Sequence, residues 1–88
     1  MRKDAEKTEG SDLLVRLNKN YKTLSKGQKQ LAAYITENYD RAAFITASKM
    51  GRIVGVSEST VVRFAYALGY DGYPELQKSL QELIRNKL

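Results

Sequence analysis

The sequence predicts an all-α protein, a five-helix bundle, and three observations support this fold class. Apolar residues recur at steps of three and four in several separate segments, which is the spacing that gives a helix one buried face. The single proline and the 28% of charged residues fit a compact helical domain better than a disordered chain. A length of 88 residues allows one small domain, which would bury about 64% of the surface that the unfolded chain exposes.

The composition also excludes several classes of function. The chain has no cysteine and no histidine, so it cannot form a disulfide, a Cys/His zinc site, a thiolate nucleophile or an imidazole acid–base group. We therefore expect no enzyme, no metal site and no cofactor. Fifteen Lys and Arg residues against ten Asp and Glu residues give a net charge of +5, which favours a polyanionic partner. There is neither a secretory signal nor a run of about 18 apolar residues, so we expect a cytoplasmic protein without a membrane span.

The first two helices are expected after a short tail. Residues 1–10 hold three basic and three acidic residues without an apolar period, so we expect a disordered polar tail at residues 1–12 and the domain itself at residues 13–88. The first helix has an apolar stripe at steps of four, four and three: Leu13, Leu17, Tyr21 and Leu24. Ser25 and Gln28 form a capping box that starts a second helix, about residues 26–38. Its stripe is Leu31, Ile35 and Tyr39, and a turn and an apolar connection at residues 42–45, packed into the core, follow it.

Residues 46–69 predict two short helices joined by a tight turn. Thr46 is a good N-cap for the first, whose buried positions are Ala47, Met50 and Val54. Gly55 falls where the chain must reverse direction with a positive φ, a conformation that is costly for other residues. Ser57 caps the second helix, and Glu58 lies in its first turn, where the helix dipole favours an acidic group. The inward stripe of this helix is Val61, Phe64 and Leu68.

The spacing of these residues is that of a helix-turn-helix at about residues 47–66, inside a tri-helical core. Gly51 is small where the two helices cross, Gly55 stands in the turn, and Val56, Val61 and Phe64 close the core between the helices. Because all these positions agree in register, the pattern is a stronger signal than any single match. After a turn at residues 71–74, a last helix is predicted by the stripe Leu76, Leu80 and Leu83.

Two strings in this part of the chain resemble a known family. GVSESTVVRF at residues 55–64 and LGYDGYPEL at residues 68–76, together with segments at 24–35 and 46–48, are similar to the N-terminal DNA-binding domain of the RpiR family of bacterial transcriptional regulators. The resemblance covers residues 13–88. It implies sequence-specific binding of double-stranded DNA and control of sugar-metabolism genes. It also implies a second, sugar-phosphate-binding (SIS) domain, which is absent from this chain, so a phosphorylated sugar effector is implied only for that domain.

The chain departs from the family pattern at three places. Gly51 stands where alanine is more usual, which costs about 1 kcal/mol of helix stability. Tyr66 and Ala67 replace a pair that is often polar or basic, which puts a phosphate contact there in doubt. Tyr70 and Tyr73 stand for more usual phenylalanines, an exchange that we expect to be neutral.

The candidate DNA contacts follow from how such motifs bind. The second helix, about residues 57–68, is expected to be the recognition helix, which enters the major groove and reads base edges with its N-terminal residues. Its outward side chains are Ser57, Glu58, Ser59, Thr60 and Arg63. Arg63 suits guanine or a phosphate, the hydroxyls suit either base type, and Glu58 suits cytosine. Thr46 and Lys49, at the start of the preceding helix, complete the candidate set, and Lys26, Lys29 and Arg52 are further possible phosphate contacts.

Plainer interpretations stay open for the same residues and for the whole domain. Ser57 serves equally as a cap alone, Glu58 as a dipole partner alone, and Arg63 as a solvated charge. A helix-turn-helix can also bind a protein or RNA, although this small, polar outer face fits a DNA groove better. With one arginine on the recognition helix, a single domain is expected to bind weakly, so we expect a homodimer or higher homo-oligomer across half-sites about 34 Å apart.

Overall fold

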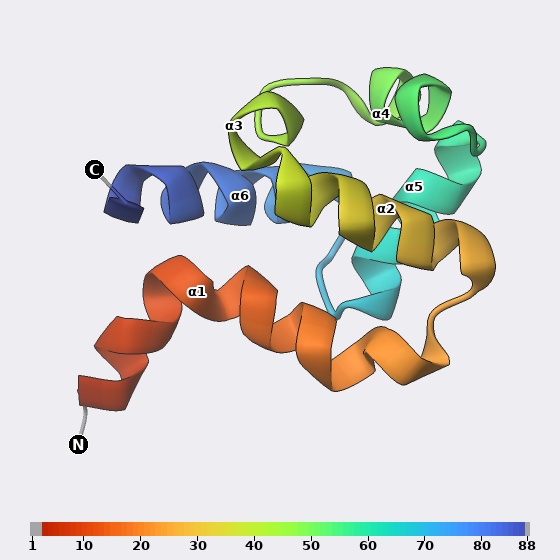
Figure 1. Cartoon of the computed structure of the whole chain (residues 1–88). Coiled ribbons are helices and arrows are strands. Elements are labelled where there is room, and N and C mark those ends of the chain that lie inside the picture. Colours follow the sequence, from red (N-terminus) through yellow and green to blue (C-terminus); the bar gives the residue numbers. More distant parts are fainter. Residues whose placement is uncertain (1–2, 88) are drawn as a thin grey trace.

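The computed structural model describes the backbone of residues 3–87 and the side chains of residues 12–85, and this part of the chain contains helices and no strand (Figure 1). The elements in order are α1 Lys3–Asn20, the 3-10 helix η1 Tyr21–Thr23, α2 Lys26–Glu37, α3 Tyr39–Ala42, α4 Ala47–Val54, α5 Glu58–Ala67 and α6 Tyr73–Lys87. The all-α fold class is confirmed. Over the described residues there are six α-helices where the sequence predicted five.

Two boundaries differ from the prediction. Helix α1 continues back to Lys3, in place of the disordered tail expected at residues 1–12, of which residues 1–2 lie outside the described part of the chain. Five of the ten residues at positions 3–12 are Ala, Glu or Lys, which favour a helix even without a buried stripe. The second difference is α3, a single turn where a turn and a connection were expected. Four residues are too few for a periodic pattern to reveal.

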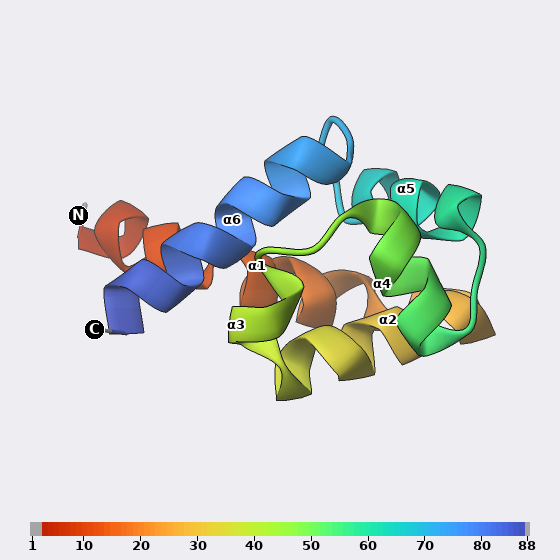
Figure 2. The same ribbon diagram turned by 90° about the horizontal axis from the view of Figure 1, so that it is seen from above.

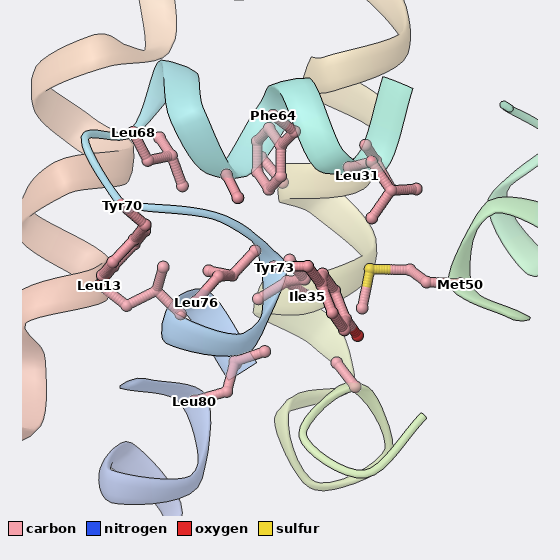
Figure 3. Packing of buried hydrophobic residues seen from close by; sticks show 14 of the residues in the cluster. Leu13, Leu31, Ile35, Met50, Phe64, Leu68, Tyr70, Tyr73, Leu76 and Leu80 are labelled. Atoms are coloured by element: carbon pink, nitrogen blue, oxygen red, sulfur yellow. The ribbon is translucent and has the colours of Figure 1, made fainter. Parts of the chain in front are cut away.

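The core joins all the longer helices (Figure 3). Leu13 of α1, Ile35 of α2, Met50 of α4, Phe64 of α5 and Leu80 of α6 are all completely buried. Each occupies a position that the apolar stripes predicted. The helical periodicity of the sequence therefore selects the correct inward face in every helix except the short α3.

Two apolar residues that were expected in the core lie at the surface instead. Tyr21 is 46% exposed, because it begins η1, where three residues per turn replace the α-helical period on which its stripe was counted. Phe44 is 69% exposed, although its neighbours Ala42 and Ala43 are fully buried. The connection at residues 42–45 therefore packs through its two alanines and turns its aromatic ring outward.

The helices divide the molecule into two ends (Figures 1 and 2). Helices α4 and α5 and the start of α2 lie at one end, and both chain ends lie at the other, where α1 and α6 pack side by side. The helix-turn-helix is thus presented away from both ends of the described chain. None of the helices described is long and apolar enough to cross a bilayer.

Side chains of α6 fix the loop that leads into α4. The Tyr73 hydroxyl and the Gln77 amide both donate to the Ile45 carbonyl, at 2.7 and 2.9 Å, and the Gln81 amide donates to the Ala43 carbonyl at 3.0 Å. Burial raises the pKa of Tyr73 from 10.0 to about 12. The Tyr73 hydroxyl therefore stays protonated at neutral pH and holds the start of α4 on the rest of the fold.

Candidate nucleic-acid interface

The turn between α4 and α5 has the backbone that its glycines predict. Gly55 ends α4 with a φ of 92°, in the left-handed region. The amides of Gly55 and Val56 both donate to the Gly51 carbonyl, at 2.7 and 2.8 Å. A Cβ on Gly51 would lie 2.7 Å from the Val56 carbonyl oxygen, so α4 packs closer to the turn than alanine allows.

Two of the candidate site residues are N-caps. Thr46 Oγ1 accepts from the Lys49 amide at 3.0 Å and starts α4. Ser57 Oγ accepts from the Thr60 amide at 3.1 Å and starts α5. The Ser57 and Thr60 hydroxyls also lie 2.9 Å apart, and Thr60 is half-buried. Both hydroxyls of the cap are therefore already used by the fold, which limits what they offer to a ligand.

The outward face of α5 carries the other candidates. Glu58, Ser59 and Arg63 are exposed, and their side chains make no hydrogen bond or ion pair with residues 12–85. Val61 and Phe64, on the opposite face, are completely buried. Helix α5 therefore separates into an apolar face that holds it in the core and a polar face that is available for contact.

Lys49 and Thr46 lie on the first turn of α4, and both are exposed. Arg52, one turn later, is also exposed and donates to Ser48 Oγ at 3.4 Å. The structure thus brings Ser57, Glu58, Ser59, Thr60 and Arg63 together on the first two turns of α5, and it holds Thr46 and Lys49 on the neighbouring helix of the motif.

Sequence reasoning missed the residue that fixes the other end of α5. Arg16 Nη1 donates to the Leu68 carbonyl at 3.1 Å, at the C-cap of α5. The same guanidinium pairs with Asp12 at 2.9 Å and lies 4.1 Å from the centre of the Tyr70 ring. A cation beside the last carbonyls of a helix is favourable for the helix dipole. No local pattern predicts this contact, because Arg16 and Leu68 are 52 residues apart in the sequence.

Tyr70 extends this contact into α6. Its hydroxyl lies 3.1 Å from Asp12 Oδ2 and 2.9 Å from Ser79 Oγ. Burial of the ring raises the pKa of Tyr70 from 10.0 to about 12. The neutral hydroxyl thus joins α1 to α6 directly beside the end of α5, so α5 is held at its C-terminal end as well as by its cap.

Residues 11–87 match the family described as "Helix-turn-helix domain, rpiR family". The chain belongs to this family. It is therefore a helix-turn-helix domain of the DNA-binding kind found in transcriptional regulators, as the resemblance implied.

Three relatives illustrate the match. The uncharacterized HTH-type transcriptional regulator YfhH of Escherichia coli K12 is 35% identical over 74 residues, 84% of this chain and 26% of that protein. HexR, an HTH-type transcriptional regulator of Pseudomonas aeruginosa, is 31% identical over 71 residues, 81% of this chain and 25% of that protein. The uncharacterized HTH-type regulator CPE0189 of Clostridium perfringens is 32% identical over 63 residues, 72% of this chain and 23% of that protein. This chain thus spans about a quarter of each relative, and no solved structure matches it.

Proposed function

We propose that this domain binds double-stranded DNA in a sequence-specific way, with α5 in the major groove. The observation that carries the proposal is the unengaged polar face of α5, where Glu58, Ser59 and Arg63 stand exposed on a helix whose other face is fixed in the core. Both ends of α5 are anchored, by the Ser57 cap and by Arg16. A rigid helix with a short polar face fits a groove about 12 Å wide.

Within this proposal the residues have different roles. Arg63 reads guanine with two hydrogen bonds, Ser59 donates to or accepts from a base edge, and Glu58 accepts from cytosine. Thr60 offers its methyl group to thymine, since its hydroxyl is shared with Ser57. Thr46, Lys49 and Ser57, at the starts of the two helices, contact phosphates and set the register of the protein on the duplex.

At the level of the whole regulator, we propose a cytoplasmic protein that acts as a homodimer or higher homo-oligomer on two half-sites and controls sugar or sugar-phosphate genes. The family resemblance supports this, as does the single arginine on the outer face of α5, which is too little for tight binding by one domain. A phosphorylated sugar would act through the sugar-phosphate-binding domain that the family joins to this one. Nothing in the fold or the relatives points to enzymatic activity of this domain.

The test is enrichment of random duplex DNA by the wild-type domain, followed by binding of the enriched duplex to Arg63→Ala and to Arg85→Ala. Arg85 is a matched control because it is an exposed arginine on α6, away from the motif. We expect Arg63→Ala to relax one base position and to weaken binding about 5- to 150-fold, the effect of 1–3 kcal/mol. Arg85→Ala should keep both the preference and the affinity. If no sequence is enriched, or if the two variants behave alike, the proposal is wrong.

A further inference from the structure

The positive charge of the chain is concentrated in one segment. Residues 13–36 contain five basic residues, Arg16, Lys19, Lys22, Lys26 and Lys29, and no acidic residue. The remaining ten basic residues of the chain equal its ten acidic residues in number. The whole net charge of +5 is therefore carried by this quarter of the sequence, which forms the second half of α1, η1 and most of α2.

This segment lies along the proposed recognition helix (Figure 1). At the start of α5, a Cβ on Gly27 would lie 3.2 Å from Val56 Cγ1 and 3.7 Å from Thr60 Cγ2, so the first turn of α2 packs on the turn of the motif. At the end of α5, Lys19 and Tyr66 line the two sides of an open groove of ≈ 420 Å³. The bend from α1 through η1 into α2 thus follows α5 from its C-terminal end back to its N-terminal end.

The lysines of this bend are available for a ligand. Lys19, Lys22 and Lys26 are exposed, and their side chains have no hydrogen bond or ion pair among residues 12–85. Lys29 is half-buried and lies 5.1 Å from the centre of the Tyr21 ring, which leaves its charge uncompensated. Arg16 is different, because Asp12 and the end of α5 already use its guanidinium.

We propose that these four lysines, which we call the basic corner (Lys19, Lys22, Lys26 and Lys29), bind the DNA phosphate backbone on one side of the groove that α5 enters. This inference rests on the proposed function. A helix about 10–12 Å across fills a major groove about 12 Å wide, so the elements beside it meet the two phosphate walls. Lys49 and Arg52 of α4 contact the phosphates on one side of the groove, and the basic corner contacts those on the other side. A row of lysines on a segment that contains no acidic residue suits a polyphosphate better than a protein surface, which presents charges of both signs.

The test compares two double variants that remove the same charge from exposed sites. Lys22→Gln with Lys26→Gln neutralises the basic corner, and Lys78→Gln with Arg85→Gln neutralises two positions on α6 as a control. Binding of the enriched duplex and of a scrambled duplex is measured by fluorescence anisotropy over a series of salt concentrations. Thermal melts of all proteins establish that each variant folds as the wild type does.

We expect the corner variant to reduce the slope of log K against log salt by about 1.8, because each lost phosphate contact removes about 0.9. Its preference for the enriched duplex over the scrambled one should stay that of the wild type, since the corner touches no bases. The α6 variant should change the slope much less. Equal slopes for the two variants would overturn the proposal.

Failure of the proposed function gives a different result. If the wild type does not discriminate between the two duplexes, sequence-specific binding is refuted. A slope change confined to the corner variant would still support the basic corner as a phosphate contact in non-specific binding. The two claims are therefore separated by two independent quantities, the ratio of affinities and the salt slope.

Discussion

Replacing Gly51 by alanine tests how closely α4 and the turn are packed. The added Cβ would lie 2.7 Å from the Val56 carbonyl oxygen and 3.3 Å from the Ser57 carbonyl carbon. An ordinary contact begins at 3.4 Å, so α4 and the turn must move apart by about 0.7 Å at this point. They are held together there, because the Gly51 carbonyl accepts from the amides of both Gly55 and Val56.

Two opposing effects decide the free energy of unfolding of Gly51→Ala. Alanine stabilises a helix by about 1 kcal/mol relative to glycine. Forcing an extra carbon into a tight contact with backbone costs about 1–3 kcal/mol, because backbone cannot rotate away as a side chain can. We therefore expect a net loss of up to about 2 kcal/mol. A loss of about 1 kcal/mol lowers Tm by about 4–8 °C in a domain of this size.

The assay is thermal and urea denaturation followed by circular dichroism, with Gly27→Ala as the matched control. A Cβ on Gly27 would meet two side-chain methyl groups, of Val56 at 3.2 Å and of Thr60 at 3.7 Å, and no backbone atom, so its neighbours can adjust. We expect Gly27→Ala to be at least as stable as the wild type, because alanine favours the helix by up to about 1 kcal/mol and meets no backbone atom there. If Gly51→Ala proves as stable as Gly27→Ala, or more stable than the wild type, the reasoning from this close crossing is refuted.

Three further predictions concern the anchors of α5 and α6. Arg16→Met should lower the free energy of unfolding by about 2–3 kcal/mol, because it removes a charged hydrogen bond to the last turn of α5; urea denaturation measures this. Ser57→Ala should cost about 1 kcal/mol as a lost cap, whereas Ser59→Ala should leave the melting curve unchanged and weaken only DNA binding. Burial raises the pKa of Tyr70 and Tyr73 from 10.0 to about 12, so their contribution to stability is complete below pH 10 and is lost as the pH rises through 12. Denaturation between pH 9 and about 12 should show this fall, and replacing either tyrosine by phenylalanine should make it shallower.

The helix-turn-helix was predictable because its determinants are local. The caps Thr46 and Ser57, the positive φ of Gly55, and the inward positions of Val61 and Phe64 each follow from neighbours within four residues. The sequence also identified which side chains of α5 point outward. It also predicted a freely accessible Thr60 side chain, however, whereas in the structure Thr60 is half-buried and its hydroxyl interacts with that of Ser57.

The parts that escaped prediction depend on distant contacts or on short elements. No local pattern singles out Arg16, since its partner at Leu68 lies far along the chain. Phe44 was predicted to be buried because it is apolar. Gln77 and Gln81 of α6, however, donate hydrogen bonds to the backbone carbonyls on either side of it, and its ring stays exposed. In both cases a long-range hydrogen bond to a backbone carbonyl fixes the position of the side chain or loop. Every residue has such a carbonyl, so the sequence does not indicate which one is used.

The same segment that carries the charge also sets the position of α5. Gly27 packs against the start of α5, and Arg16 binds the end of α5, so residues 16–27 hold both ends of this helix. Three lysines of the basic corner, Lys19, Lys22 and Lys26, lie on that same segment, and Lys29 follows it by two residues. The side chains proposed to read bases and those proposed to bind phosphates therefore keep a fixed geometry relative to each other. Because the phosphates fix the register, a shift of this segment would misplace Arg63 even if every base-reading side chain were intact.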